Sequence, residues 1–191
     1  VNYFDGDYIN DLRDAMVASL VAGVNGVVIG APGFGKTRVL KSLLQTIYGD
    51  RFSFVEFHEA TQPSEIQGET DYDHLMAHSQ LRRNLTGTPY DPNYLAGGLD
   101  EFGRTNDAVY SRLMHLLARD GQTPVPFIGT ANYMPTGKKH EALLDRFGMY
   151  HYVTTGELNA EDMAMAQMSR VETDPALKVR GRIPTVEEIL K

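Results

Sequence analysis

Residues 30–37 place three glycines, a lysine and a threonine in the spacing G-x-x-x-x-G-K-[ST], which is typical of a phosphate-binding loop. Glycine allows the backbone to turn tightly and to aim successive N–H groups at phosphate oxygens. In such a loop Lys36 reaches the β- and γ-phosphates, and the Thr37 hydroxyl is a ligand for Mg²⁺. The residues that we expect to contact the bound nucleotide are Pro32, Gly33, Phe34, Gly35, Lys36, Thr37 and Arg38.

Two acidic residues, Asp100 and Glu101, follow the apolar run of residues 94–99. Hydrolysis of a nucleoside triphosphate needs an Asp that holds Mg²⁺, directly or through water, and a Glu that polarises the attacking water. An acidic pair at a strand end is more often only a solvated surface pair. Because the phosphate-binding loop lies upstream, we favour the catalytic interpretation, with Asp100 as a metal ligand and Glu101 as the base.

Asn132 and Arg146 complete the candidate set. Asn132 ends the next predicted strand, where its amide could reach the γ-phosphate or the attacking water; a turn-forming Asn is the alternative. Arg146 follows a short predicted helix, where a single Arg is usually a surface charge or the partner of a nearby acid. In NTPases that assemble in rings, an Arg at such a boundary reaches the neighbouring subunit's γ-phosphate. We therefore predict Glu101, Asn132 and Arg146 as catalytic residues.

The elements that must position these residues alternate between strands and helices. Hydrophobic periodicity predicts helices over 8–22, 38–48, 106–119, 140–144 and 160–170. The predicted strands cover residues 25–29, 52–57, 125–130 and 150–154, with a weaker one over 94–99 because two glycines lie inside it. This alternation predicts an α/β P-loop NTPase fold, with a parallel sheet covered by helices on both faces.

Residues 58–94 lack clear periodicity, although residues 75–85 could form a short helix. Long irregular segments inside compact domains are usually functional or mobile. His74 and His78 have the spacing of a metal-binding pair on a helix, but the segment offers no clear third ligand. We interpret both as solvated residues of this segment.

Composition limits the class of protein. The 191 residues suffice for one domain with a sizeable core, or for one domain and part of another. A net charge of −7 disfavours nucleic acid and favours protein partners. The absence of cysteine excludes disulfides and thiolate metal ligands. No stretch approaches the roughly 18 apolar residues of a membrane span, and the first residues do not form a signal peptide, so we expect a cytoplasmic protein.

Five segments together resemble the MoxR-type AAA+ ATPases in order and spacing. They are residues 30–37, 61–68, 99–104, 129–132 and 142–147. The resemblance covers residues 7–154 and implies a role for each candidate. Lys36 and Thr37 would be Walker A residues, Asp100 and Glu101 Walker B, Asn132 sensor 1, and Arg146 the arginine finger that acts in the neighbouring subunit.

The resemblance also implies partners and domain organisation. It implies ATP or ADP with Mg²⁺, a homo-oligomer in the form of a hexameric ring, and a protein client reached through a von Willebrand factor A-domain adaptor. Residues 61–68 resemble the family's helix-2 insert, which would project toward the ring pore. We expect an AAA+ nucleotide-binding domain over residues 1–155 and the start of a truncated helical lid over 156–191, with Arg170 and Arg180 available for a sensor 2 role.

The predicted function is therefore ATP hydrolysis coupled to the remodelling, or chaperone-like activation, of a protein client. Two alternatives remain open at this point. One is a nucleic-acid-dependent AAA+ motor, and the other is a nucleotide-gated assembly module with little turnover.

Overall fold

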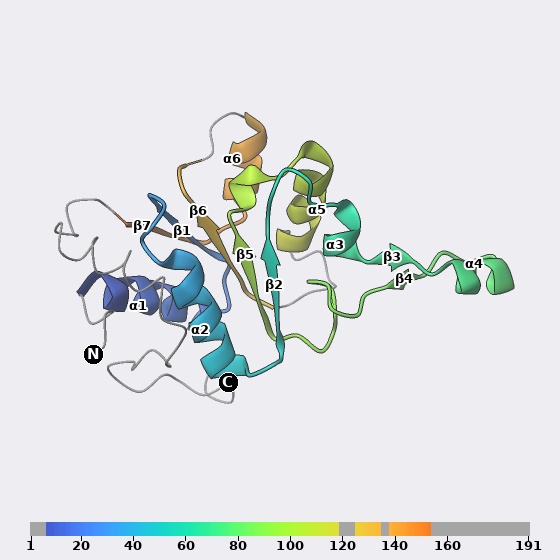
Figure 1. Cartoon of the computed structure of the whole chain (residues 1–191), viewed down its shortest axis with the longest axis horizontal. Coiled ribbons are helices and arrows are strands. Elements are labelled where there is room, and N and C mark those ends of the chain that lie inside the picture. Colours follow the sequence, from blue (N-terminus) through green and yellow to red (C-terminus); the bar gives the residue numbers. More distant parts are fainter. Residues whose placement is uncertain (1–6, 119–124, 135–137, 154–191) are drawn as a thin grey trace.

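The computed structural model describes residues 7–118, 125–134 and 138–153 (Figure 1). Its main sheet has five parallel strands in the order β2-β5-β6-β1-β7. Their bounds are β1 Gly26–Gly30, β2 Phe52–Glu56, β5 Ala96–Asp100, β6 Phe127–Ala131 and β7 Met149–Val153. All five carboxyl ends therefore lie at one edge of the sheet, which we call the carboxyl edge. The opposite edge, where the strands begin, is the amino edge.

Helices cover both faces of this sheet, as the sequence predicts. On one face, α1 (Asp7–Val21) and α2 (Lys36–Tyr48) pack over β1, β5 and β6, and their buried side chains form one apolar cluster. On the other, α3 (Pro63–Gln67), α5 (Asp107–Leu117) and α6 (Lys138–Leu144) form a second cluster with the same three strands (Figure 1). The predicted α/β P-loop NTPase architecture is confirmed.

Strand β5 is a fully buried inner strand despite its two glycines. A Cβ atom on Gly97 would lie 2.1 Å from the Phe127 ring, and one on Gly98 would lie 2.6 Å from the Phe54 ring. The aromatic rings of the two flanking strands therefore occupy the space that larger β5 side chains would take. The weak strand signal arose from this packing, because glycine is necessary here for the rings to fit.

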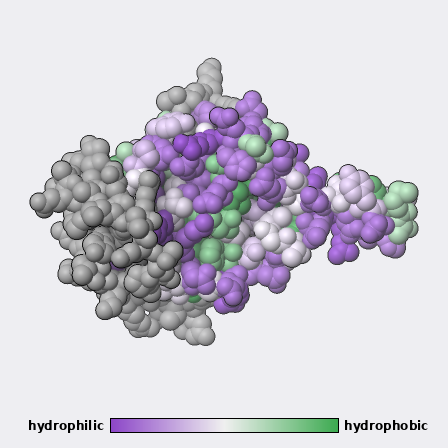
Figure 2. Space-filling model, viewed as in Figure 1, coloured by the Kyte–Doolittle hydropathy of each residue, from purple (hydrophilic) through white to green (hydrophobic). Residues whose placement is uncertain are grey.

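A slender arm projects from the body between α3 and β5 (Figure 1). It consists of the short antiparallel strands β3 (Glu69–Thr70) and β4 (Arg83–Asn84) with helix α4 (Tyr72–His78) at its tip. None of the residues of α4 is buried. Figure 2 shows apolar atoms at the tip, where Tyr72, Met76 and Leu81 are exposed.

Two expectations about this region are wrong. The helix covers Tyr72–His78 and not residues 75–85, because the Asp71 side chain caps its start and left-handed Ser79 ends it. The projecting segment is the arm and not residues 61–68. Those residues include α3, which packs against α5 with Ile66 fully buried, so they belong to the body.

Several expectations lie outside the described residues. They are the helix over 160–170, the lid over 156–191, and the two candidate sensor 2 residues Arg170 and Arg180. Within the ranges that the structure describes, no helix is both long and apolar enough to cross a bilayer.

Candidate active site

The loops and strand ends that carry the predicted site residues meet at the carboxyl edge. The phosphate-binding loop follows β1, Asp100 ends β5, and Asn132 follows β6, the strand between them. Ligand sites of open α/β sheets collect at this edge. The main-sheet topology therefore brings together side chains that are up to 96 residues apart in sequence.

Asp100 lies beneath the loop, where two hydroxyl groups donate to its carboxylate. Thr37 Oγ1 lies 2.9 and 2.8 Å from the two carboxylate oxygens, and Thr130 Oγ1 donates to Oδ1. Burial raises the pKa of Asp100 above its ordinary value, and the hydrogen bonds from Thr130 and Thr37 oppose this shift. The structure thus brings the two predicted metal ligands, Thr37 and Asp100, into direct contact, with the Asp100 side chain buried.

These oxygen atoms suit a hard divalent cation. Mg²⁺ prefers oxygen ligands and is commonly held by one or two protein groups together with phosphates and water. A buried carboxylate beside a hydroxyl fits that requirement. Among the described residues, no group of three or more His, Cys, Asp or Glu side chains could hold a metal by itself. A metal at Thr37 and Asp100 would therefore depend on ligands from the substrate and solvent.

Lys36 belongs to the same cluster and is almost fully buried. Its Nζ donates to Gly30 O at 2.7 Å, Ala31 O at 2.8 Å and Asn132 Oδ1 at 3.0 Å. Burial lowers the pKa of Lys36, while the charges of Asp100 and Glu101 raise it. The ammonium group is thus directed toward both the loop and Asn132.

Glu101 has an unusual backbone conformation for a residue with a side chain, with φ 53° and ψ 36°. Its N–H donates to Thr130 Oγ1 at 3.1 Å. Asn132 Nδ2 donates to Glu101 Oε1 at 2.9 Å, and Arg104 Nη1 lies 2.7 Å from Oε2. A hydrogen-bonded chain therefore runs from Lys36 through Asn132 to Glu101, which are three of the predicted site residues.

Two residues of this arrangement were missing from the sequence-based candidates. Thr130 is fully buried and contacts both Asp100 and Glu101. The period of two along β6 places it on the same face as Asn132, which is a signal that could have identified it. Arg104 lies three residues after Glu101 in the turn Phe102–Arg104, but the sequence alone does not show that this turn folds as a 3₁₀ helix.

The remaining loop residues have different environments. Gly33 and Gly35 have positive φ values of 93° and 71°, which the tight loop requires. Phe34 is buried in the cluster formed with α1 and α2, so only its backbone is placed to meet a ligand. Pro32 is exposed, and Arg38 is partly buried in the first turn of α2.

Arg146 lies away from this cluster, at the amino edge. Its Nε donates to Met114 O at 3.1 Å and its Nη1 to Ala142 O at 2.6 Å, near the ends of α5 and α6. Asn25, the residue before β1, donates to the Arg146 carbonyl oxygen at 3.1 Å. The five residues of β1 separate Asn25 from the phosphate-binding loop, a span of roughly 16 Å. The structure therefore does not bring Arg146 to its own loop.

Comparison with one solved structure supports this fold. A putative ATPase from Cytophaga hutchinsonii superposes with a TM-score of 0.58 at 20% identity, over 96% of this chain and 60% of that one. The chain thus spans about three fifths of that protein's length. The RuvB Holliday junction branch migration motor of Thermotoga maritima gives a TM-score of 0.44 at 21% identity, over 84% of this chain and 49% of that one. A score below 0.5 informs neither the fold nor the function.

A search of curated proteins found no match. A family model described as the MoxR domain in the MoxR-vWA-beta-propeller ternary systems matches residues 2–178, which is most of the chain. The resemblance seen in the sequence motifs is therefore confirmed, and the chain belongs to this MoxR family of AAA+ ATPases.

Proposed function

We propose that this protein hydrolyses ATP to ADP and phosphate. The family and the fold support nucleotide binding and ATPase chemistry. The observation that carries the proposal is the hydrogen-bonded chain from Lys36 through Asn132 to Glu101, beside the pair formed by Thr37 and Asp100. A phosphate-binding lysine, a metal-binding pair and a water-activating carboxylate are the parts that this reaction requires.

Each residue has a specific part in the proposed reaction. The loop N–H groups and Lys36 bind the phosphates. Thr37 and Asp100 would hold Mg²⁺, which would supply positive charge to offset the charge of the phosphates. Glu101 accepts a proton from the attacking water, whose oxygen forms a bond to the γ-phosphorus as the bond to ADP breaks. Asn132 orients Glu101 and the water.

The site is completed by a second copy of the chain. Arg146 lies at the amino edge of its own sheet, so we propose that it reaches the γ-phosphate of a neighbouring subunit. A head-to-tail contact of this kind forms a ring when the rotation between subunits closes, and a hexamer is the state that the family resemblance implies. Residues 1–155 would form the nucleotide-binding domain of each subunit, and residues 156–191 would begin its lid.

The proposed output is remodelling of a protein client. The family description names systems that contain vWA and beta-propeller components, which supports a von Willebrand factor A-domain partner. The projecting arm, residues 69–84, is the described segment best placed to meet a client beyond the body (Figure 1).

A comparison of the wild type with Glu101→Gln tests the proposed reaction. We expect Mg²⁺-dependent phosphate release from the wild type, and at least about a 100-fold lower rate with retained ATP binding in Glu101→Gln, because the proton acceptor is lost. Glu69→Gln, an exposed substitution on the arm, is the matched control. Normal turnover by Glu101→Gln would contradict the assignment. Binding and assembly without turnover in the wild type would indicate a nucleotide-gated module, and strong stimulation by DNA would indicate a nucleic-acid motor.

A further inference from the structure

Arg104 contacts the proposed base directly. Its Nη1 lies 2.7 Å from Glu101 Oε2, while Asn132 Nδ2 donates to the other carboxylate oxygen at 2.9 Å. Each oxygen of Glu101 therefore has its own donor, one from the turn after β5 and one from the end of β6. Two donors on two oxygens fix the plane of a carboxylate, whereas a single donor leaves it free to rotate.

The same residue also closes the turn that holds Glu101. The Arg104 N–H donates to the Glu101 carbonyl oxygen at 2.9 Å. The left-handed backbone of a Glu residue costs free energy and persists only where the surroundings enforce it. Thr130 holds the Glu101 N–H, Arg104 holds its C=O, and the buried Phe102 ring anchors the turn between them. Backbone and side chain are thus fixed together.

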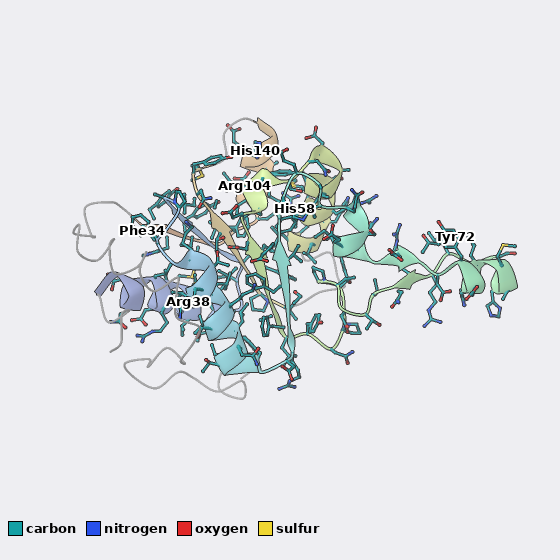
Figure 3. The ribbon with its side chains drawn as sticks, viewed as in Figure 1. Phe34, Arg38, His58, Tyr72, Arg104 and His140 are labelled. Atoms are coloured by element: carbon teal, nitrogen blue, oxygen red, sulfur yellow. The ribbon has the colours of Figure 1, made fainter. Side chains whose placement is uncertain are left out.

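This contact contributes little to the stability of the fold. The Arg104 side chain is 57% exposed and that of Glu101 is 29% exposed, so water screens their attraction. Figure 3 shows Arg104 in the upper part of the view, below His140 and beside the carboxyl ends of the strands. The pair is therefore better explained by the orientation that it gives Glu101 than by any stabilisation of the body.

We infer that Arg104 is a positioning residue that holds the Glu101 carboxylate toward the attacking water. This inference rests on the proposed function, because it requires Glu101 to act as the base. Asn132 lies between Lys36 and Glu101, so its amide also responds to whatever Lys36 binds. Arg104 is the donor to Glu101 that is independent of the phosphate-binding loop.

The test is steady-state ATP hydrolysis by Arg104→Ala, Arg104→Lys and Glu101→Gln in the full chain. Misplacement of a catalytic group lowers turnover without weakening ground-state binding. We expect Arg104→Ala to lower kcat roughly tenfold with an unchanged KM. Arg104→Lys should recover to within about threefold of the wild type, because it keeps one charged donor. Arg51→Ala, a substitution at the exposed residue just before β2, is the control and should leave kcat unchanged.

The outcomes separate this inference from the proposed function. An unchanged or raised kcat for Arg104→Ala, with Glu101→Gln inactive, would overturn the positioning role alone. A raised KM or weaker nucleotide binding for Arg104→Ala would also overturn it, since the residue would then act in binding. Normal turnover by Glu101→Gln would overturn both proposals. If Arg104→Ala does not fold, Arg104→Gln takes its place, with the same expected loss of kcat.

Discussion

The two edges of the main sheet differ in how they hold their candidate residues. At the carboxyl edge, buried or half-buried groups from three strand ends contact one another directly, as in the pairs Thr37 with Asp100 and Asn132 with Glu101. At the amino edge, the Arg146 guanidinium contacts only backbone carbonyls in the bonds that the structure describes for it. The carboxyl edge holds a network of predicted site residues, and the amino edge holds one predicted site residue, Arg146.

This difference bears on whether Arg146 can act in the active site of its own subunit. Strand β1 connects the two edges, beginning after Asn25 and ending at the phosphate-binding loop. Strand β1 pairs in parallel with β6 and β7, and this pairing fixes the distance between the carboxyl edge and the amino edge. Arg146 lies at the far end of β1 from its own loop, so in the proposed assembly it would serve the loop of a neighbouring subunit. A substitution at the carboxyl edge should therefore impair hydrolysis in the subunit that carries it. A substitution of Arg146 should impair hydrolysis in the neighbouring subunit.

The largest effect is expected for Lys36→Ala at the carboxyl edge. This change removes the ammonium group that donates to Gly30, Ala31 and Asn132. Hydrogen bonds from a charged donor contribute about 1.5–3 kcal/mol each, so loss of those to phosphate should weaken nucleotide binding about 100-fold or more. Titration with a fluorescent ATP analogue measures this. Nucleotide affinity equal to that of the wild type would remove Lys36 from the site.

A smaller effect is expected for Thr130→Val, which keeps the shape of the side chain and removes its hydroxyl. Asp100 would lose a buried donor and the Glu101 N–H an acceptor. We expect the free energy of unfolding to fall by about 1–3 kcal/mol, and kcat to fall roughly tenfold because both carboxylates shift. Denaturant unfolding and phosphate release measure these changes, with exposed Thr86→Val as the control. A kcat that is normal in a destabilised protein would limit Thr130 to a structural role.

The smallest effect is expected for Met76→Ser on the arm, which belongs to neither edge. Met76 is 84% exposed, and none of the residues of α4 is buried. Its replacement should change the free energy of unfolding by less than about 0.5 kcal/mol and leave hydrolysis without a client unaltered. Thermal melting and phosphate release measure both. A clear loss of basal hydrolysis would show that the arm, as well as the two edges of the sheet, contributes to the site.

The strand-loop-helix unit and the site residues on it could be predicted because their signals are local. The phosphate-binding loop has a fixed spacing, and α2 has a clear apolar stripe. The contact between Thr37 and Asp100 follows once the strands are parallel, because both residues then lie at the same edge. The sequence pattern therefore predicted five of the clustered residues, which are Lys36, Thr37, Asp100, Glu101 and Asn132. It did not identify Thr130 or Arg104.

Features that depend on distant neighbours were not predictable in the same way. Gly97 weakens a strand signal by itself, yet β5 is a buried strand because Phe127 covers that glycine. Arg104 lies within the segment 99–104 that carries the family resemblance, but the sequence does not show that the left-handed turn at Glu101 brings its guanidinium back to the carboxylate. The helix predicted over residues 75–85 was wrong because the segment lacks apolar periodicity, and the start of α4 is set by the side chain of Asp71.

A mixing experiment tests whether Arg146 of one subunit serves the active site of the next subunit. Arg146→Ala should bind ATP but hydrolyse it at least about 100-fold more slowly, and Lys36→Ala should not bind it. In a random 1:1 mixture, Arg146→Ala sites beside Lys36→Ala subunits regain a finger, so hydrolysis should recover to about a quarter of the wild-type rate. No recovery in mixed assemblies, or normal turnover by Arg146→Ala alone, would contradict the account.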